Sequence, residues 1–183
     1  MEQGRVEAPA TVVGPRIIRD LGRLREMASA QAEQLRLAER PGMRLFGDVA
    51  PLEPMLARVR GTRGRPYYLV PFGIHRTEIQ AAMILNAYTG AYEESIVLPV
   101  DCFFKFFTRA EALELAIEKF RVPAEWLSLP SLLFRATVET PDRFFPVWHV
   151  GLQRDVFVTP RGEAIHRLAA TEEEFWSRSE RRG

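Results

Sequence analysis

This sequence of 183 residues is poor in the residue types that form covalent cross-links and metal sites. It contains one cysteine, Cys102, and three histidines, His75, His149 and His166. A single cysteine excludes a disulfide within the chain and a metal site with several cysteine ligands. The histidines are widely spaced, and none stands four residues from another as in helical zinc motifs. The sequence therefore predicts no metal and no other cofactor.

An excess of one charge and long apolar runs are also absent. The 25 Lys and Arg residues balance 24 Asp and Glu residues, so the net charge of +1 provides no general attraction to nucleic acid. A mean hydropathy of −0.14 argues against an integral membrane protein. Residues 1–14 lack the apolar stretch of a signal peptide. We therefore expect a cytoplasmic protein with no transmembrane segment and no nucleic-acid partner.

Residues for nucleophilic catalysis are scarce as well. Cys102 follows Asp101 and could pair with one of the distant histidines as a nucleophile. A lone cysteine in an apolar run is more often a small buried hydrophobic residue, and no cysteine-peptidase signature surrounds this one. We assign no catalytic residue, and an enzyme is the less favoured expectation.

A long amphipathic helix is expected near the N-terminus. Apolar residues recur at spacings of three, four or seven from Arg16 to Arg40, with a gap at Gln31, before Pro41-Gly42 ends the pattern. The propensity of such a helix alone gives marginal stability in water, so it must pack on another surface. We expect it to dock on the rest of the protein through Leu21 and Leu24, with a homodimer as the alternative.

Two capping boxes predict further helices. In the first, Thr108 and Glu111 can cap each other's backbone, and the helix that follows should end before Pro123. The second box, Thr171–Glu174, begins a closing helix. The pattern over Asp48–Arg60 is compatible with a short helix, with its prolines confined to the first turn.

Two stretches of the chain look like copies of one strand-turn-strand unit. In each, a proline is followed at two-residue steps by an aromatic residue, Tyr68 or Trp148, and by a valine. A second strand, broken by Gly90 or Gly162, comes next. Such self-similarity predicts related structural units. The matching segments are 66–70 with 83–92 and 146–150 with 155–165.

These patterns predict an α+β protein with two related helix-plus-antiparallel-sheet units, preceded by the long amphipathic helix. We divide the chain into a flexible lead-in (1–15), a docking helix (16–40), a first unit (41–107) and a second unit with the closing helix (108–183). The aromatic run Phe103–Phe107 lies at the boundary of the units. Both its burial between them and its exposure as a docking patch remain open.

The pattern of the two units resembles the PepSY-type domain, a small cystatin-like unit in which a helix packs across an antiparallel sheet, so the chain resembles two such domains in tandem. The residues that carry the resemblance are Pro146–Val150 and Val156–Ala164, together with the turn Ala87–Ala91. Family members have a strand ending in tryptophan-x-valine and then a strand with a glycine turn. The family's usual aspartate is absent before the Gly90 turn, and Asn86 stands nearby. The resemblance implies a regulatory or accompanying module of a peptidase.

Two functions remain in view. The first is a non-enzymatic protein-binding or regulatory module that takes an extended peptide segment of a partner by strand addition. The alternative is a small-molecule-binding protein, or a small enzyme, with a pocket between helix and sheet. Tyr68, Trp148 and His149 are the candidate contact residues for a partner or ligand. The lack of a converging acid, base and nucleophile favours the first function.

Overall fold

The computed structural model describes residues 16–40, 49–60, 64–76, 78–98, 107–135, 137, 140, 142–151, 155–166 and 168. Within these residues the protein has two α-helices and nine β-strands in one mixed sheet, so the predicted α+β class is confirmed. Cys102, the residues 103–106 of the aromatic run and the expected helix from Thr171 lie outside the described residues. None of the helices that the structure describes is long and apolar enough to cross a membrane.

The first helix, α1, is shorter than the predicted Arg16–Arg40. It spans Leu21–Gln34 and begins after Asp20, whose side chain accepts a hydrogen bond from the Arg23 N–H at 2.9 Å. It is followed by the 3-10 turn η1 (Leu37–Glu39), with Arg36 in the left-handed conformation at φ 47°. The periodic apolar pattern continues through these breaks, but an N-cap and a left-handed residue stop the hydrogen-bond ladder.

The second helix, α2, confirms its sequence prediction. It spans Arg109–Phe120, and both bonds of the capping box are present. Thr108 Oγ1 accepts from the Glu111 N–H at 3.1 Å, and the Glu111 carboxylate accepts from the Thr108 N–H at 2.7 Å. The helix ends at Arg121, which is left-handed at φ 52°, before Pro123 as expected.

The short helix expected over Asp48–Arg60 is wrong, because the described part of this segment forms strands β1 and β2. β2 pairs on one side with β3, the next strand in the chain, and on the other side with β6, about 75 positions later. The second pairing is a tertiary contact that a local pattern does not show. The strands are β1 (Ala50–Pro51), β2 (Met55–Val59), β3 (Tyr67–Gly73), β4 (Ile79–Asn86), β5 (Tyr92–Val97), β6 (Ser131–Phe134), β7 (Val147–Val150), β8 (Val156–Val158) and β9 (Ala164–Ile165).

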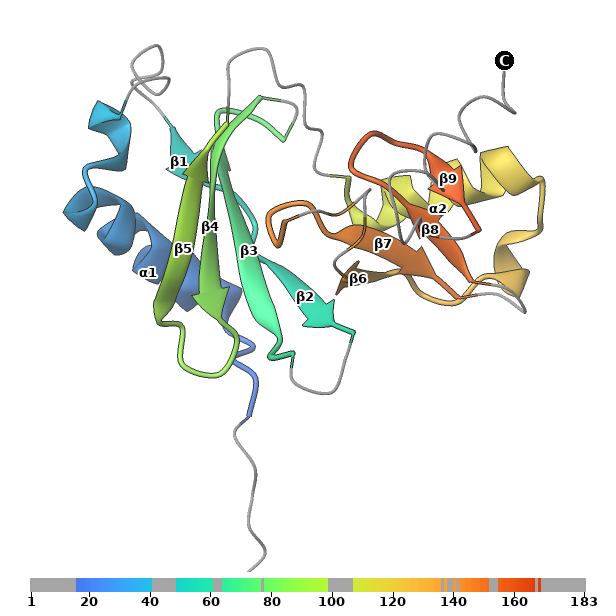
Figure 1. The fold of residues 1–183 in the computed structure, drawn as a ribbon, viewed down its shortest axis with the longest axis horizontal. Coiled ribbons are helices and arrows are strands. Elements are labelled where there is room, and N and C mark those ends of the chain that lie inside the picture. The colour runs from blue at the N-terminus through green and yellow to red at the C-terminus, as the bar shows by residue number, and fades with distance from the viewer. Residues whose placement is uncertain are drawn as a thin grey trace, which may run out of the picture.

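The sheet runs in the order β5-β4-β3-β2-β6-β7-β8-β9, with β1 added beside β3. The β2–β6 pair is parallel, and the other pairs among the described strands are antiparallel. The two sheets predicted for separate units are thus joined into one. Figure 1 shows α1 beside β3–β5 at one end of this sheet and α2 beside β7–β9 at the other.

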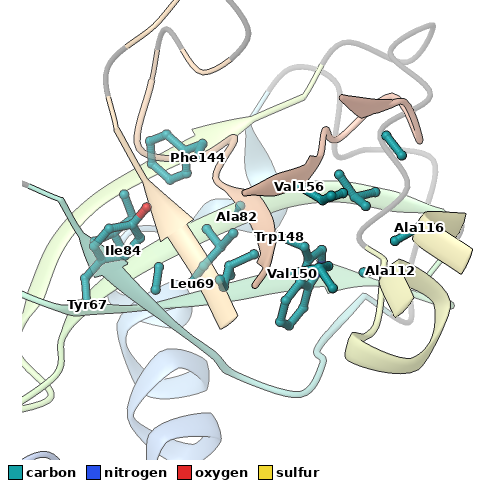
Figure 2. Packing of buried hydrophobic residues seen from close by; sticks show 14 residues of the cluster. Tyr67, Leu69, Ala82, Ile84, Ala112, Ala116, Phe144, Trp148, Val150 and Val156 are labelled. Carbon is teal, nitrogen blue, oxygen red and sulfur yellow. The ribbon is translucent and has the colours of Figure 1, made fainter. Parts of the chain in front are cut away.

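The two helices cover opposite faces of the sheet. Tyr67, Ala57, Leu132 and Trp148 are successive pairing partners across β3, β2, β6 and β7, so they share one face. α2 packs on this face, where Ala112 and Ala116 join the same core cluster (Figure 2). The alternate residues of β3, which include Tyr68, Val70 and Phe72, face α1, and they cluster with its Leu24 and Ala28.

Candidate functional site

A cavity of about 780 Å³ lies beside the β2–β6 junction. Its lining comes from the start of α1, the segment before β2, strands β2, β3, β6 and β7, and the start of α2. The lining residues are Leu21, Leu52, Glu53, Pro54, Met55, Leu56, Arg58, Tyr68, Pro71, Arg76, Phe107, Thr108, Arg109, Ala110, Ser131, Leu132 and Trp148.

The cavity reaches both faces of the sheet. Tyr68 belongs to the face that α1 covers, and Trp148 belongs to the face that α2 covers. Both line the same cavity because β2 and β6 start here, and the space extends around the ends of these two strands. Two of the three predicted contact residues therefore come together from segments 80 positions apart.

The polar atoms of these two aromatic residues are already engaged. Tyr68 is buried, and its hydroxyl donates to the Ile18 carbonyl at 2.5 Å. Burial raises the pKa of Tyr68 above its ordinary value. Trp148 Nε1 donates to the Phe107 carbonyl at 2.8 Å. Both residues can therefore offer a ligand the surface of a ring, and neither has a spare donor.

The charged lining was missed by the sequence analysis. Arg58, Arg76 and Arg109 border the cavity together with Glu53. Arg76 is bound to Glu53, with 2.9 Å between Nη2 and Oε2. Arg58 was assigned to a helix that does not exist, and Arg109 looked like an ordinary first-turn residue. No local pattern places these two side chains together, because Arg58 lies on β2 and Arg109 begins α2, 51 positions later.

His149, the third predicted contact residue, is not part of this lining. Its Nε2 lies 2.8 Å from the Asp155 carboxylate, and its ring lies 5.2 Å from the ring of Phe157. Ser131, which does line the cavity, is its pairing partner on β6. The part of the chain that the structure describes also holds no cluster of three potential metal ligands.

The helix residues Leu21 and Leu24 have different roles. Leu24 is fully buried in the cluster between α1 and the sheet, whereas Leu21 is half-buried and borders the cavity. α1 thus packs on the protein's own sheet and at the same time closes one side of the cavity.

The glycines of the two similar sequence segments share a backbone conformation. Gly90 has φ 71° and Gly162 has φ 78°. A side chain at Gly90 would meet Met27 and Ile18, and one at Gly162 would meet Phe107. Ile18 and Phe107 are also the residues whose carbonyls accept from Tyr68 and Trp148. Each glycine therefore packs beside the segment that leads into a helix.

A second candidate surface is β5, the edge strand at one end of the sheet. It has six residues, of which Tyr92, Glu93 and Glu94 are exposed and the remaining three are half-buried. The opposite edge, β9, has two residues. β5 is therefore the edge with enough length to pair with another strand.

Comparison with known proteins gives no family. No protein-family model and no curated protein matches the chain. A solved structure described as a "putative lipoprotein" from Clostridium difficile 630 is similar over 77% of this chain and 88% of that chain. The sequence identity is 12% and the TM-score is 0.26, so this likeness carries no inference about function.

Proposed function

We propose that this protein is a non-enzymatic binding module that takes an extended segment of a partner protein along the edge of β5. The observation that carries the proposal is the geometry of this edge. Strand addition joins the main chain of the bound segment to unpaired backbone groups, and it needs an accessible strand of several residues. β5 meets this requirement, since within the described residues its ladder is with β4 alone.

The outward backbone groups of β5 can be identified. The Leu98 N–H donates to the Gln80 carbonyl of β4 at 2.7 Å, so this position points toward β4. Backbone groups alternate in direction along an antiparallel strand. Ser95 and Val97 therefore direct their N–H and C=O groups away from β4, and both offer them to an added strand.

Charge indicates the chemistry of the bound segment. Glu93 is engaged by Arg143 at 2.6 Å and by the Asn86 amide at 3.0 Å. Glu94 is exposed and has no ion pair among the described residues. Like charges at a strand pairing are unfavourable, so two β5 strands are poor partners for each other. A segment with β-branched residues and a basic residue opposite Glu94 fits better.

The resemblance to PepSY-type domains makes a peptidase the proposed carrier of this segment. Binding along β5 would then accompany or regulate that enzyme. The small-molecule alternative concerns a separate place in the molecule, the cavity at the β2–β6 junction.

We also propose that the chain consists of two related units. The supporting features recur in both halves: a helix followed by strands in the sheet order β2-β3-β4-β5 or β6-β7-β8-β9. An aromatic residue donates to a carbonyl just before each helix, and a glycine of positive φ packs there. A twofold axis that runs along the strands between β2 and β6 would keep these two strands parallel and would place the two helices on opposite faces of the sheet. Both features are present, which supports two related units.

The binding proposal is tested with peptides selected from a random library on the immobilised protein. We expect enriched sequences with alternating β-branched residues and a basic residue, and protection of the Ser95 and Val97 amides from hydrogen exchange when they bind. Ser95→Pro removes an outward N–H and should weaken binding about tenfold, because one hydrogen bond is lost and the proline ring obstructs the approach of the added strand.

The charge contribution has its own control. Glu94→Lys should weaken binding of the basic peptides, whereas Glu118→Lys on the exposed face of α2 makes the same change of charge away from β5 and should leave binding intact. Binding that is unaffected by both Ser95→Pro and Glu94→Lys, or protection of amides elsewhere alone, would contradict the proposal.

A further inference from the structure

We infer that the cavity at the β2–β6 junction binds a small amphipathic anion, a molecule with an apolar body and one carboxylate or similar acidic group. The site is separate from the β5 edge, and it rests on different residues. The inference combines the charge, the ring surfaces and the size of the cavity.

The charge of the lining favours an anion. Three arginines against one glutamate give the lining a formal charge of +2. Arg76 is committed to Glu53 by their ion pair. The guanidinium groups of Arg58 and Arg109 have no ion pair or hydrogen bond among the residues that the structure describes. A guanidinium group is well suited to a carboxylate, because its N–H fork can bind both oxygens.

The rest of the lining favours an apolar body. Leu56 and Leu132 border the cavity together with the rings of Tyr68 and Trp148. The hydroxyl of Tyr68 and the indole N–H of Trp148 are used by backbone carbonyls. Their ring surfaces can therefore contact a hydrocarbon or aromatic body without leaving a polar group unsatisfied.

The volume sets the size of the ligand. At about 780 Å³ the cavity is in the range of small-molecule sites in proteins. A folded protein domain does not fit, and inorganic anions would leave the apolar lining unused. A metabolite-sized acid uses both the arginines and the rings, which makes it the occupant to which the inference commits.

Three probes of equal chain length test this inference on the whole 183-residue chain: decanoate, decanol and decylamine, each below the concentration at which it forms micelles or a separate phase. Calorimetric titration should show decanoate binding most tightly, decanol more weakly and decylamine weakest. Added salt should weaken decanoate binding and leave decanol binding nearly unchanged. Only decanoate carries a charge whose attraction to the arginines is screened by salt. Failure of decanoate to bind, or equal binding of decanoate and decylamine, would overturn the inference.

Two variants locate the binding. The double substitution Arg58→Gln with Arg109→Gln should weaken decanoate binding about tenfold and spare decanol, since charge-assisted contacts are lost. The matched control, Arg65→Gln with Arg161→Gln, changes two exposed arginines outside the lining and should have no such effect. Ser131→Phe fills part of the cavity and should weaken both decanoate and decanol. Decanoate binding equal to wild type in the Arg58/Arg109 variant would place the ligand elsewhere and refute the site.

Discussion

The hydroxyl of Tyr67 donates a hydrogen bond to the backbone carbonyl of Arg143 at 2.6 Å, and the Arg143 guanidinium carbon lies 4.6 Å from the centre of the same ring. The Arg143 side chain continues to Glu93 at the start of β5. Arg143, in the segment that precedes β7, thus connects β3 with β5, although it lies 76 positions after Tyr67 in the chain. This connection ties the loop between β6 and β7 to the half of the sheet that carries the β5 edge.

Removal of the Tyr67 hydroxyl should destabilise the protein. Tyr67→Phe leaves the buried ring in place but leaves the Arg143 carbonyl without this donor, and we expect the free energy of unfolding to fall by about 1 kcal/mol. The hydroxyl of Tyr88 has no hydrogen-bond partner among the described residues, so Tyr88→Phe is a matched control. Urea denaturation of the two variants measures the difference. Equal stability of Tyr67→Phe and Tyr88→Phe would show that the bond contributes nothing.

Stability should decline in alkaline solution. Burial raises the pKa of Tyr67 well above its ordinary value of 10.0, and the nearby Arg143 lowers it by a smaller amount. Burial also raises the pKa of Tyr68. Above pH 10 the unfolded chain releases these protons before the folded protein does, so the free energy of unfolding falls as the pH rises. Denaturation curves between pH 9 and about 11 test this, and Tyr67→Phe should make the decline less steep.

Substitution of either turn glycine, Gly90 or Gly162, by alanine should lower the free energy of unfolding. Gly90→Ala and Gly162→Ala force a side chain into the left-handed region, and we expect each to cost at least about 1 kcal/mol. At Gly162 the new Cβ would also lie 2.9 Å from the Phe107 ring, whereas at Gly90 the flexible end of Met27 can move aside. Gly22→Ala in α1 is the control, because Gly22 has no positive φ and should change stability by less than about 1 kcal/mol. A thermal melt that gives the three variants equal stability would refute the strain.

The packing of α1 on the sheet should be strongly sensitive to Leu24. This side chain is fully buried, so Leu24→Ala should lower the free energy of unfolding by about 3 kcal/mol through lost burial and a residual cavity. Leu129 is 79% exposed, and Leu129→Ala removes the same atoms with little expected effect. Equilibrium denaturation compares the two variants. A Leu24→Ala protein as stable as Leu129→Ala would mean that α1 does not pack on its own sheet in solution.

Local interactions made α2 predictable from the sequence. The Thr108–Glu111 capping box acts within one helical turn, and the left-handed Arg121 and Pro123 end the helix within a few residues. The strand character of 66–70 and of 83–86 was recognisable for a related reason: these segments follow each other after a short connection and pair in the sheet. The predicted second strand over 83–92 is wrong beyond Asn86, where β4 ends and a turn with Gly90 leads to β5 at Tyr92. The length of α1 was overestimated because apolar spacing carries no information about the N-cap at Asp20 or the left-handed Arg36.

Contacts between distant segments decided the rest. Met55–Val59 lies as a strand between β3, which follows it in the chain, and β6, which lies about 75 positions later, and no local pattern shows the β6 partner. The same parallel pairing brings Arg58 to the cavity with Arg109 and Trp148, and it leaves β5 at the edge of the sheet. The sequence alone determined where α2 begins and the strand character of 67–70 and 147–150, because those features arise from interactions between near neighbours. The order of the described strands, the cavity and the position of β5 at the edge arise from pairing across the chain, which only the tertiary structure decides.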